Sequence, residues 1–424
     1  MNTHDLLLLL PQLGVILLIT TLCGWIAQRL RQPRVIGEIA GGLLLGPLAL
    51  GRLAPALHAQ LFPATHLDNL VFLSNVGLIA FLFLTGAELD IDSVRRNPRR
   101  NIAITLGNIG LPFAFALLIA SPLRSAFGLT NVPSGAFALF VGIALSITAL
   151  PVLARIIEER KADRHPVDAA IAATSIVCAA ANDLVAWTLA LTITIAHTQR
   201  LGHNLVTTSW HVALLLAYVA FMLQVVRPLA KRILIFSKHR PRTWLWLPCA
   251  LLLAVASANF TLWLGMHLFF GSFLAGVCIP VSHKRGVALD LALRKTLRPV
   301  IAITLPVFFA ITGLRMGTAS LTSASLRWFV VITALAVIGK IGGGMLSARA
   351  TRLAWKPSIQ IGILMNTRGL VELIVLNVGL REGVLNPTLF TVFVLMALVT
   401  TAMTAPLLDL SQYLTRPAAP APNP

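Results

Sequence analysis

The stretch SITALP, residues Ser146–Pro151, interrupts a long apolar segment with two hydroxyl side chains and a proline. A second stretch, MNTRGL at Met365–Leu370, interrupts another apolar segment with an amide, a hydroxyl, an arginine and a glycine. Proline removes a backbone donor and clashes with the preceding helical turn, and glycine loosens a helix. Each stretch therefore predicts a helix that breaks in the middle of an apolar span. Two proline-kinked or glycine-kinked packing helices are the alternative.

Apolar residues dominate the chain around these two stretches. Of the 424 residues, 57% are hydrophobic and 12% are charged, and the mean hydropathy is +0.84. Soluble domains carry about twice that charged fraction, and a membrane-spanning helix needs about 20 mostly apolar residues. The sequence therefore predicts an all-α polytopic membrane protein. We place thirteen spans, near 6–28, 35–51, 67–87, 101–121, 134–156, 166–196, 205–227, 243–264, 266–282, 297–314, 327–348, 358–381 and 387–411.

The net charge of +19 is carried by short basic clusters between the apolar runs. No basic patch is interleaved with aromatic residues, so a nucleic-acid partner is not expected. With the N-terminus outside, these clusters face the cytoplasm, as the positive-inside rule requires. They lie at 29–34, 95–100, 155–164, 227–242, 284–298 and 349–356. We therefore predict a multi-pass protein of the cell (inner) membrane, with residues 412–424 as a short disordered cytoplasmic tail.

The chain also contains two pairs of similar segments. Gly37–Pro47 resembles Gly271–Pro280, and Phe81–Gly86 resembles Phe308–Gly313. Both pairs are offset by roughly 230 residues. An odd number of spans separates the partners, so the two halves run in opposite directions through the membrane. Inverted repeats are a recurring plan of secondary transporters, which bind their substrates near the midplane. Chance similarity of glycine-rich segments is the alternative.

Ionisable groups inside a bilayer are costly and therefore call for a reason. Asp183, beside Asn182, lies near the middle of the sixth span. A carboxylate there can hold a proton or a dehydrated cation, but hardly both, and this exclusivity is the physical basis of exchange. The amide of Asn182 and the oxygens of Ser146 and Thr148 can complete a site for a hard cation. Alternatively, Asp183 only pairs with a buried lysine or arginine.

Three further ionisable residues lie within spans. Lys340, in a glycine-rich part of the eleventh span, can pair with Asp183 or neutralise the negative ends of the broken helices; snorkelling to a surface is the alternative. Arg368 and Glu372 are four residues apart and share a helix face, so we interpret them as a structural ion pair, with a gating role as the alternative. No nucleophile–base motif, phosphate loop or histidine pair at metal spacing indicates an enzyme or a cofactor.

At these residues the chain resembles the monovalent cation:proton antiporter superfamily, of the sodium/hydrogen exchanger type, over residues 6 to 411. Its motif sequences are most similar to those of the plant cation/proton exchangers, the fungal K+/H+ exchangers and their bacterial relatives. The matching stretches are Ile36–Pro47, Phe81–Asp90, Ser146–Arg155, Asn182–Asp183 and Met365–Leu376.

The resemblance implies an NhaA-type fold in which two broken helices cross, and a homodimer. One transporter domain, 1–411, would comprise a dimerisation part (spans 1–3 and 8–10), a core part (spans 4–6 and 11–13) and a linker near 205–227. Asp183 matches the family's ion-binding aspartate, and Lys340 matches a core lysine that partners it in some members. Electrogenic members carry an acid at the place of Asn182, so the stoichiometry stays open.

The expected function is antiport of Na+ or K+ against protons by alternating access, with the cation at Asp183. A cation channel and a non-transporting membrane sensor are the rivals from other classes. Both cations are hard and bind oxygen, so the sequence does not choose between them.

Overall fold

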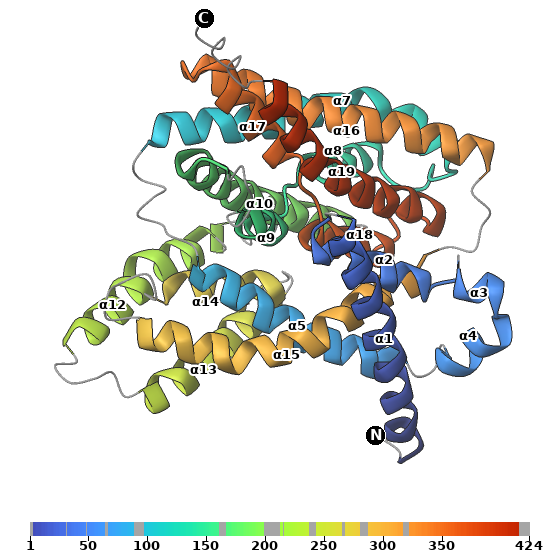
Figure 1. The fold of residues 1–424 in the computed structure, drawn as a ribbon, viewed down its shortest axis with the longest axis horizontal. Helices are drawn as coiled ribbons and strands as arrows, with labels where there is room; N and C mark the ends of the chain where they lie inside the picture. The colour runs from blue at the N-terminus through green and yellow to red at the C-terminus, as the bar shows by residue number, and fades with distance from the viewer. Residues whose placement is uncertain are drawn as a thin grey trace, which may run out of the picture. The chain divides into compact units, whose positions relative to one another are not determined.

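A computed structural model describes residues 3–30, 32–47, 49–63, 67–88, 97–160, 167–198, 213–214, 216–236, 243–264, 268–279, 287–316 and 322–414. Within these ranges the chain contains helices and turns and no β-strand (Figure 1). In chain order the helices are α1 Thr3–Arg29, α2 Arg34–Leu44, α3 Leu50–Leu53, α4 Pro55–Leu61, α5 Leu67–Glu88, α7 Pro98–Ala126, α8 Ser134–Ser146, α9 Leu150–Arg160, α10 Ala169–Thr198, the π-helical turn η3 Met222–Val226, α12 Arg227–Phe236, α13 Thr243–Trp263, α14 Leu268–Cys278, α15 Val287–Leu314, α16 Ser323–Ala350, α17 Trp355–Met365, α18 Leu370–Arg381 and α19 Pro387–Leu414.

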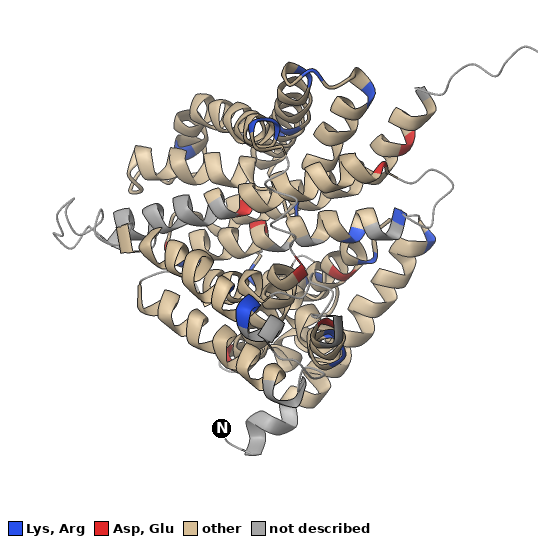
Figure 2. Cartoon of the chain, turned by 90° about the vertical axis from the view of Figure 1, so that its left-hand side faces the viewer, with Lys and Arg blue, Asp and Glu red and all other residues tan. Residues whose placement is uncertain are grey.

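Seven of the described helices are long and apolar enough to cross a membrane, namely α1, α5, α7, α13, α15, α16 and α19. Shorter apolar helices are α8, α14 and the first half of α10, Ala169–Asp183. Charged side chains are sparse along these helices, most of whose ribbon is tan in Figure 2. The predicted all-α, polytopic class is confirmed.

Some boundaries differ from the prediction. The span expected at 35–51 is shorter than predicted. Helix α2 ends at Leu44, and a turn at Gly46 and Pro47 follows. Helix α15 begins at Val287, well before the expected 297, and its first turns carry an ion pair between Arg294 and Asp290 at 2.9 Å. Such i,i+4 pairs stabilise a helix beyond its apolar run. Predictions at 199–212, 95–96, 161–166, 237–242, 284–286 and 415–424 lie outside the described residues.

The chain divides into two compact units. The first comprises Met1–Ile26, Gly37–Asp92 and Trp187–Thr318, and the second comprises Ala27–Ile36, Ser93–Ala186 and Ala319–Pro424. Each unit is assembled from segments of both halves of the sequence. All the predicted site residues fall in the second unit.

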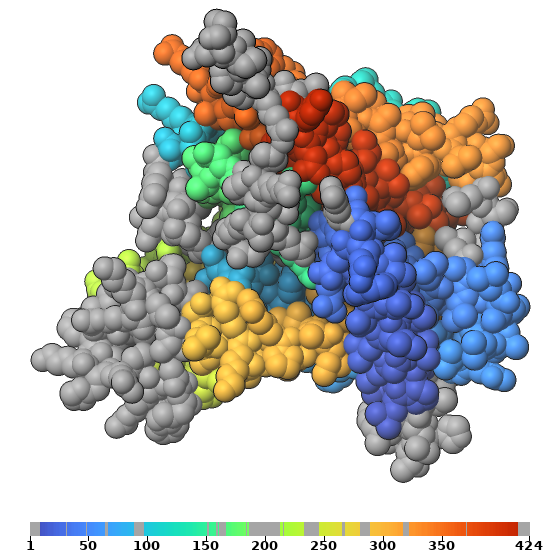
Figure 3. All heavy atoms as spheres, viewed as in Figure 1, coloured from blue at the N-terminus to red at the C-terminus, as the bar shows by residue number. Residues whose placement is uncertain are grey.

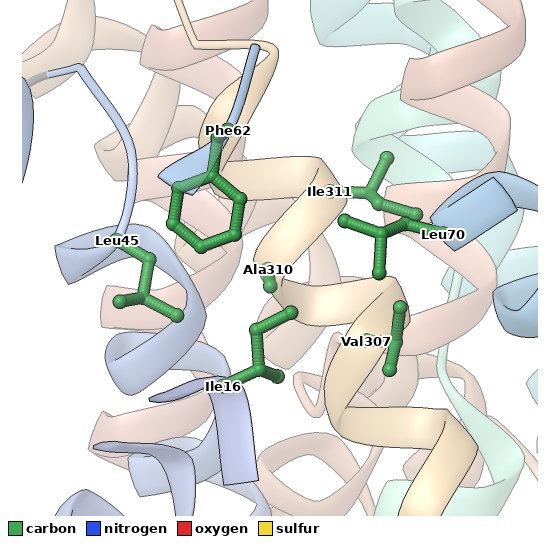
Figure 4. Packing of buried hydrophobic residues seen from close by; sticks show 7 residues of the cluster. All are labelled: Ile16, Leu45, Phe62, Leu70, Val307, Ala310 and Ile311. Carbon is green, nitrogen blue, oxygen red and sulfur yellow. The ribbon is translucent and has the colours of Figure 1, made fainter. Parts of the chain in front are cut away.

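The first unit is packed through glycines. A Cβ on Gly42 of α2 would lie 2.4 Å from the carbonyl carbon of Phe309 on α15, and a Cβ on Gly276 of α14 would lie 2.0 Å from the carbonyl oxygen of Phe83 on α5. Only glycine permits such close approach of helix backbones. A buried apolar cluster lies beside the first contact (Figure 4), and its members are Ile16, Leu45, Phe62, Leu70, Val307, Ala310 and Ile311.

The second unit is organised around α16, which runs beside α7 and α17 (Figure 1). Here too small residues allow a close contact, since a Cβ on Gly343 would lie 2.3 Å from the carbonyl oxygen of Gly107. Helix α16 (orange in Figure 3) also exposes large apolar side chains such as Val330 and Ile338, as expected for a helix that faces lipid. Helix α16 therefore supports the site and also presents exposed apolar side chains.

Candidate functional site

The first predicted break lies between α8 and α9. Helix α8 ends at Ser146, the next residue, Ile147, is extended (φ −62°, ψ 139°), and α9 begins at Leu150. Pro151 lies in the first turn of α9, where its missing N–H has no intrahelical role. The proline that predicted the break therefore starts the second half-helix.

The second predicted break lies between α17, which ends at Met365, and α18, which begins at Leu370. Gly369 has φ 153° and ψ −129°, a conformation that side-chain-bearing residues rarely adopt. The two breaks touch, because the N–H of Ala149 donates to the carbonyl of Thr367 at 3.0 Å. The hydroxyl of Thr148 also lies 3.0 Å from the carbonyl oxygen of Met365, to which it donates.

Three oxygen atoms meet at this junction and form what we call the oxygen triangle: Asn108 Oδ1 from α7, the carbonyl oxygen of Ser146, and Thr148 Oγ1. The ammonium of Lys340 donates to Asn108 Oδ1 at 2.5 Å, to the Ser146 carbonyl at 2.6 Å, and to Thr148 Oγ1. The amide of Asn182 approaches the same three atoms, at 3.2, 2.9 and 3.0 Å. All five residues are buried, so the triangle binds two nitrogen donors away from water.

Asp183 follows Asn182, whose amide contacts the triangle, and 4% of the surface of Asp183 is exposed. The backbone N–H of Leu150, at the N-terminus of α9, acts favourably on the carboxylate of Asp183, as expected at a helix end where the dipole favours negative charge. The carboxylate oxygen Oδ1 is buried and has no hydrogen-bond partner. A buried carboxylate oxygen without a partner in the protein calls for an explanation, and binding of a proton or a cation supplies one.

The predicted charge partner, Lys340, lies in the same site as Asp183. Their charges act on one another. Among the described ion pairs of 4 Å or less, however, none joins Lys340 to Asp183. The ammonium is bound by neutral oxygens instead, one of which is the free carbonyl at the C-terminus of α8.

Arg368 and Glu372 form the predicted i,i+4 ion pair at 3.1 Å, and both side chains are fully buried. The guanidinium also donates to the carbonyls of Ala144 at 2.5 Å and Leu145 at 2.6 Å. Three consecutive carbonyls at the C-terminal end of α8 are therefore bound by buried cations, two by Arg368 and one by Lys340. Positive charge at a helix C-terminus is favourable.

Two residues of this site, Asn108 and Thr401, are not among those predicted from the sequence. Asn108 is a neutral amide within an apolar span, and attention to ionisable groups alone passes over it. Thr401 of α19 accepts from the N–H of Arg368 at 2.9 Å and shares its own proton between the carbonyls of Arg368 and Ala397. Ser146 takes part through its carbonyl, because its hydroxyl donates back to Gly142 at 2.7 Å. A polar residue within an otherwise apolar helix was the available signal.

No resident metal centre is indicated in the described part of the chain, where no group of three or more His, Cys, Asp or Glu residues converges. Two helix breaks that touch beside a buried carboxylate, in a polytopic helical protein, are characteristic of secondary ion transporters with discontinuous helices.

Comparison with known proteins identifies the family. Residues 17–410 match the profile of the transmembrane sodium/hydrogen exchangers, and the chain belongs to this family. It is 37% identical over 417 residues to the Na(+)/H(+) antiporter NhaS4 of Synechocystis sp., covering 96% of this chain and 98% of that protein.

Two longer relatives are similar over the same region. Identity is 39% to Cation/H(+) antiporter 17 of Arabidopsis thaliana, covering 95% of this chain and 48% of the plant protein. It is 31% to K(+)/H(+) antiporter 1 of Saccharomyces cerevisiae, covering 96% of this chain and 47% of the yeast protein. The chain thus spans about half the length of these two relatives.

The fold is similar to that of the sodium proton antiporter MjNhaP1 from Methanocaldococcus jannaschii. The TM-score is 0.66 at 16% sequence identity, and the match covers 97% of each chain. At this identity the similarity concerns the fold alone.

Proposed function

We propose that this chain exchanges a monovalent cation, Na+ or K+, for protons by alternating access, with Asp183 as the exchanging group. The observation that carries the proposal is the buried carboxylate oxygen of Asp183 that has no hydrogen-bond partner, beside the junction of two broken helices. The relatives are named as Na+/H+ and K+/H+ antiporters, which supports the substrate class.

The chemistry follows from one carboxylate with two competing ligands. A protonated Asp183 is neutral and offers a poor cation site, whereas the ionised form binds a cation through its oxygens. The hydroxyl of Thr148, the carbonyl of Ser146 and the amide oxygen of Asn182 can replace part of the cation's hydration shell, as oxygen ligands suit hard cations. Lys340 balances the charge of the site. Exchange results when Asp183 releases the proton on one side of the membrane and the cation on the other.

The architecture in which Asp183 would work is also a proposal. We place thirteen spans in two inverted repeats, with a dimerisation part, a core part and a linker near 205–227. Two matched close contacts support the repeat. Gly42 and Gly276 lie in the first pair of similar segments, and each contacts a residue of the second pair, Phe309 and Phe83 respectively. The division into two compact units supports a core that moves as a body.

The same proposal includes the cellular setting. The protein is a homodimer in the inner membrane, surrounded by lipid, with its N-terminus outside and its C-terminus in the cytoplasm. The basic residues between the spans support this orientation through the positive-inside rule.

Proton flux in everted membrane vesicles tests the proposed function. We expect Na+ or K+ to dissipate a respiration-generated pH gradient in vesicles with the wild-type chain, and Asp183→Asn to abolish this response in a normally inserted protein. Comparing Na+, K+, Rb+ and Li+ at several pH values identifies the cation. Cation flux without proton coupling indicates a channel, absence of flux indicates a sensor, and coupled flux in Asp183→Asn removes the mechanism.

A further inference from the structure

We propose that Asn108 is a positioning residue for exchange, whose side-chain oxygen holds the ammonium of Lys340 on the oxygen triangle and keeps it from pairing with Asp183. The inference rests on the proposed role of Asp183. It assigns a task to a residue of α7, outside both helix breaks.

The amide of Asn108 is bound to both ends of Lys340. Its Nδ2 donates to the backbone carbonyl of Lys340 at 3.1 Å, and its Oδ1 accepts from the Lys340 ammonium at 2.5 Å. Because a carbonyl can only accept, the first contact fixes which side of the amide is nitrogen. The oxygen therefore has to face the triangle, and the side chain is held without freedom to flip.

The number of oxygen acceptors in the triangle equals the number of N–H donors on the ammonium. A lysine ammonium has three N–H donors, and the triangle supplies three oxygens. The same oxygens are contacted by the amide of Asn182, and Asn108 Oδ1 is also 3.3 Å from the hydroxyl of Thr148. The Thr148 hydroxyl has one proton, which it donates to Met365, so the two lone pairs of the Asn108 amide oxygen meet the Lys340 ammonium and the Asn182 amide. The charged donor at the shorter distance makes the stronger bond. Asn108 thus binds Lys340 more strongly than it binds Asn182.

Loss of the Asn108 oxygen leaves one buried N–H of the ammonium without an acceptor. An unsatisfied buried donor on a charged group is costly, so the side chain is expected to move to another acceptor. Asp183 offers one, since its Oδ1 has no hydrogen-bond partner and its charge already acts on Lys340. An ammonium paired with Asp183 occupies the oxygen that the cation needs. The cation must then displace it, and cation affinity falls.

The test compares four proteins in a double-mutant cycle: wild type, Asn108→Leu, Lys340→Met and the double variant. Each is purified in detergent, and the half-saturating concentrations of Na+ and K+ are measured from cation-dependent thermal stabilisation, which requires binding but no transport. Thr105→Val, which removes a buried hydroxyl from the preceding turn of α7, is the matched control. Asn108→Ser, alone and with Lys340→Met, replaces the leucine pair if that pair does not fold.

We expect Asn108→Leu to raise the half-saturating concentration about tenfold, the factor for a charged hydrogen bond that changes partner. In the Lys340→Met background the same substitution should change it less than about twofold, because the competitor is gone. An equal rise in both backgrounds overturns the proposal and makes Asn108 a direct cation ligand. No rise in the single variant, or no cation-dependent shift in the wild type, also overturns it. Cation binding without exchange in vesicles contradicts the proposed function alone.

Discussion

The guanidinium of Arg368, beside the start of α18, lies 2.5 Å from the carbonyl oxygen of Ala144 in the last turn of α8. A residue of the second helix break therefore caps the helix that ends at the first. Together with the contact between Lys340 and Ser146, this places the whole C-terminal end of α8 under buried positive charge. The two breaks are consequently one electrostatic unit, and a change at one is expected to affect the other.

Substitutions at Arg368 should therefore lower the stability of the protein more than substitutions at Glu372. Glu372→Gln leaves the guanidinium with two carbonyl acceptors, whereas Arg368→Gln leaves a buried carboxylate without its cation and removes the donor to the Ala144 and Leu145 carbonyls. Breaking a buried pair typically costs about 3–5 kcal/mol. We expect both variants to have lower thermal stability, with Arg368→Gln lower. A normally stable Glu372→Gln with altered ion preference would make the pair part of the ion site.

Gly369→Ala should destabilise the second break. The backbone at this residue has φ 153°, and an added Cβ would lie 2.7 Å from Val152 Cγ2. Strained conformations of this kind cost about 1–3 kcal/mol. Gly135→Ala, in α8 with nothing within 4 Å of the added methyl, is the control and should be neutral or slightly stabilising. Thermal unfolding in detergent measures both, and equal melting temperatures would contradict the strain argument.

Thr401→Val should impair exchange more than Thr400→Val. The hydroxyl of Thr401 accepts the backbone N–H of Arg368, whereas the hydroxyl of Thr400 donates only within α19. Valine keeps the shape and leaves the buried N–H of Arg368 without a partner, at about 1–3 kcal/mol. We expect a slower exchange rate in proteoliposomes and lower stability for Thr401→Val. Equal effects of the two substitutions would show that the contact does not position the break.

Exchange should be one proton for one cation and insensitive to membrane voltage. With Asn182 neutral and the ammonium of Lys340 keeping its charge throughout the cycle, Asp183 alone sets the proton count. The measurement is Na+-driven proton flux in proteoliposomes whose potential is clamped by K+ and valinomycin. A rate or accumulation ratio that changes with the potential would place Lys340 in the proton path.

The sequence by itself determined the class of the fold, the position of most of the long apolar helices and both helix breaks. Hydropathy, proline and glycine act on their own segment of chain. Apolar helices and their breaks can therefore be predicted without knowing what packs against them. It also marked Asp183, Lys340, Arg368 and Glu372, because a charge in an apolar run is conspicuous. Helix ends were less predictable, as at α15, where an ion pair extends the helix beyond its apolar run.

Only the tertiary structure decided which atoms these side chains meet. Lys340 contacts Asn108 across 232 positions of sequence, and Arg368 reaches Ala144 across 224. The sequence suggested Asp183 or the helix ends as acceptors for Lys340, and packing placed the ammonium at the end of α8. The roles of Asn108 and Thr401 could not be predicted either, because their partners come from distant parts of the sequence. A neutral polar side chain acquires its role from the donors and acceptors that packing brings to within 3 Å, and no local property of the chain encodes them.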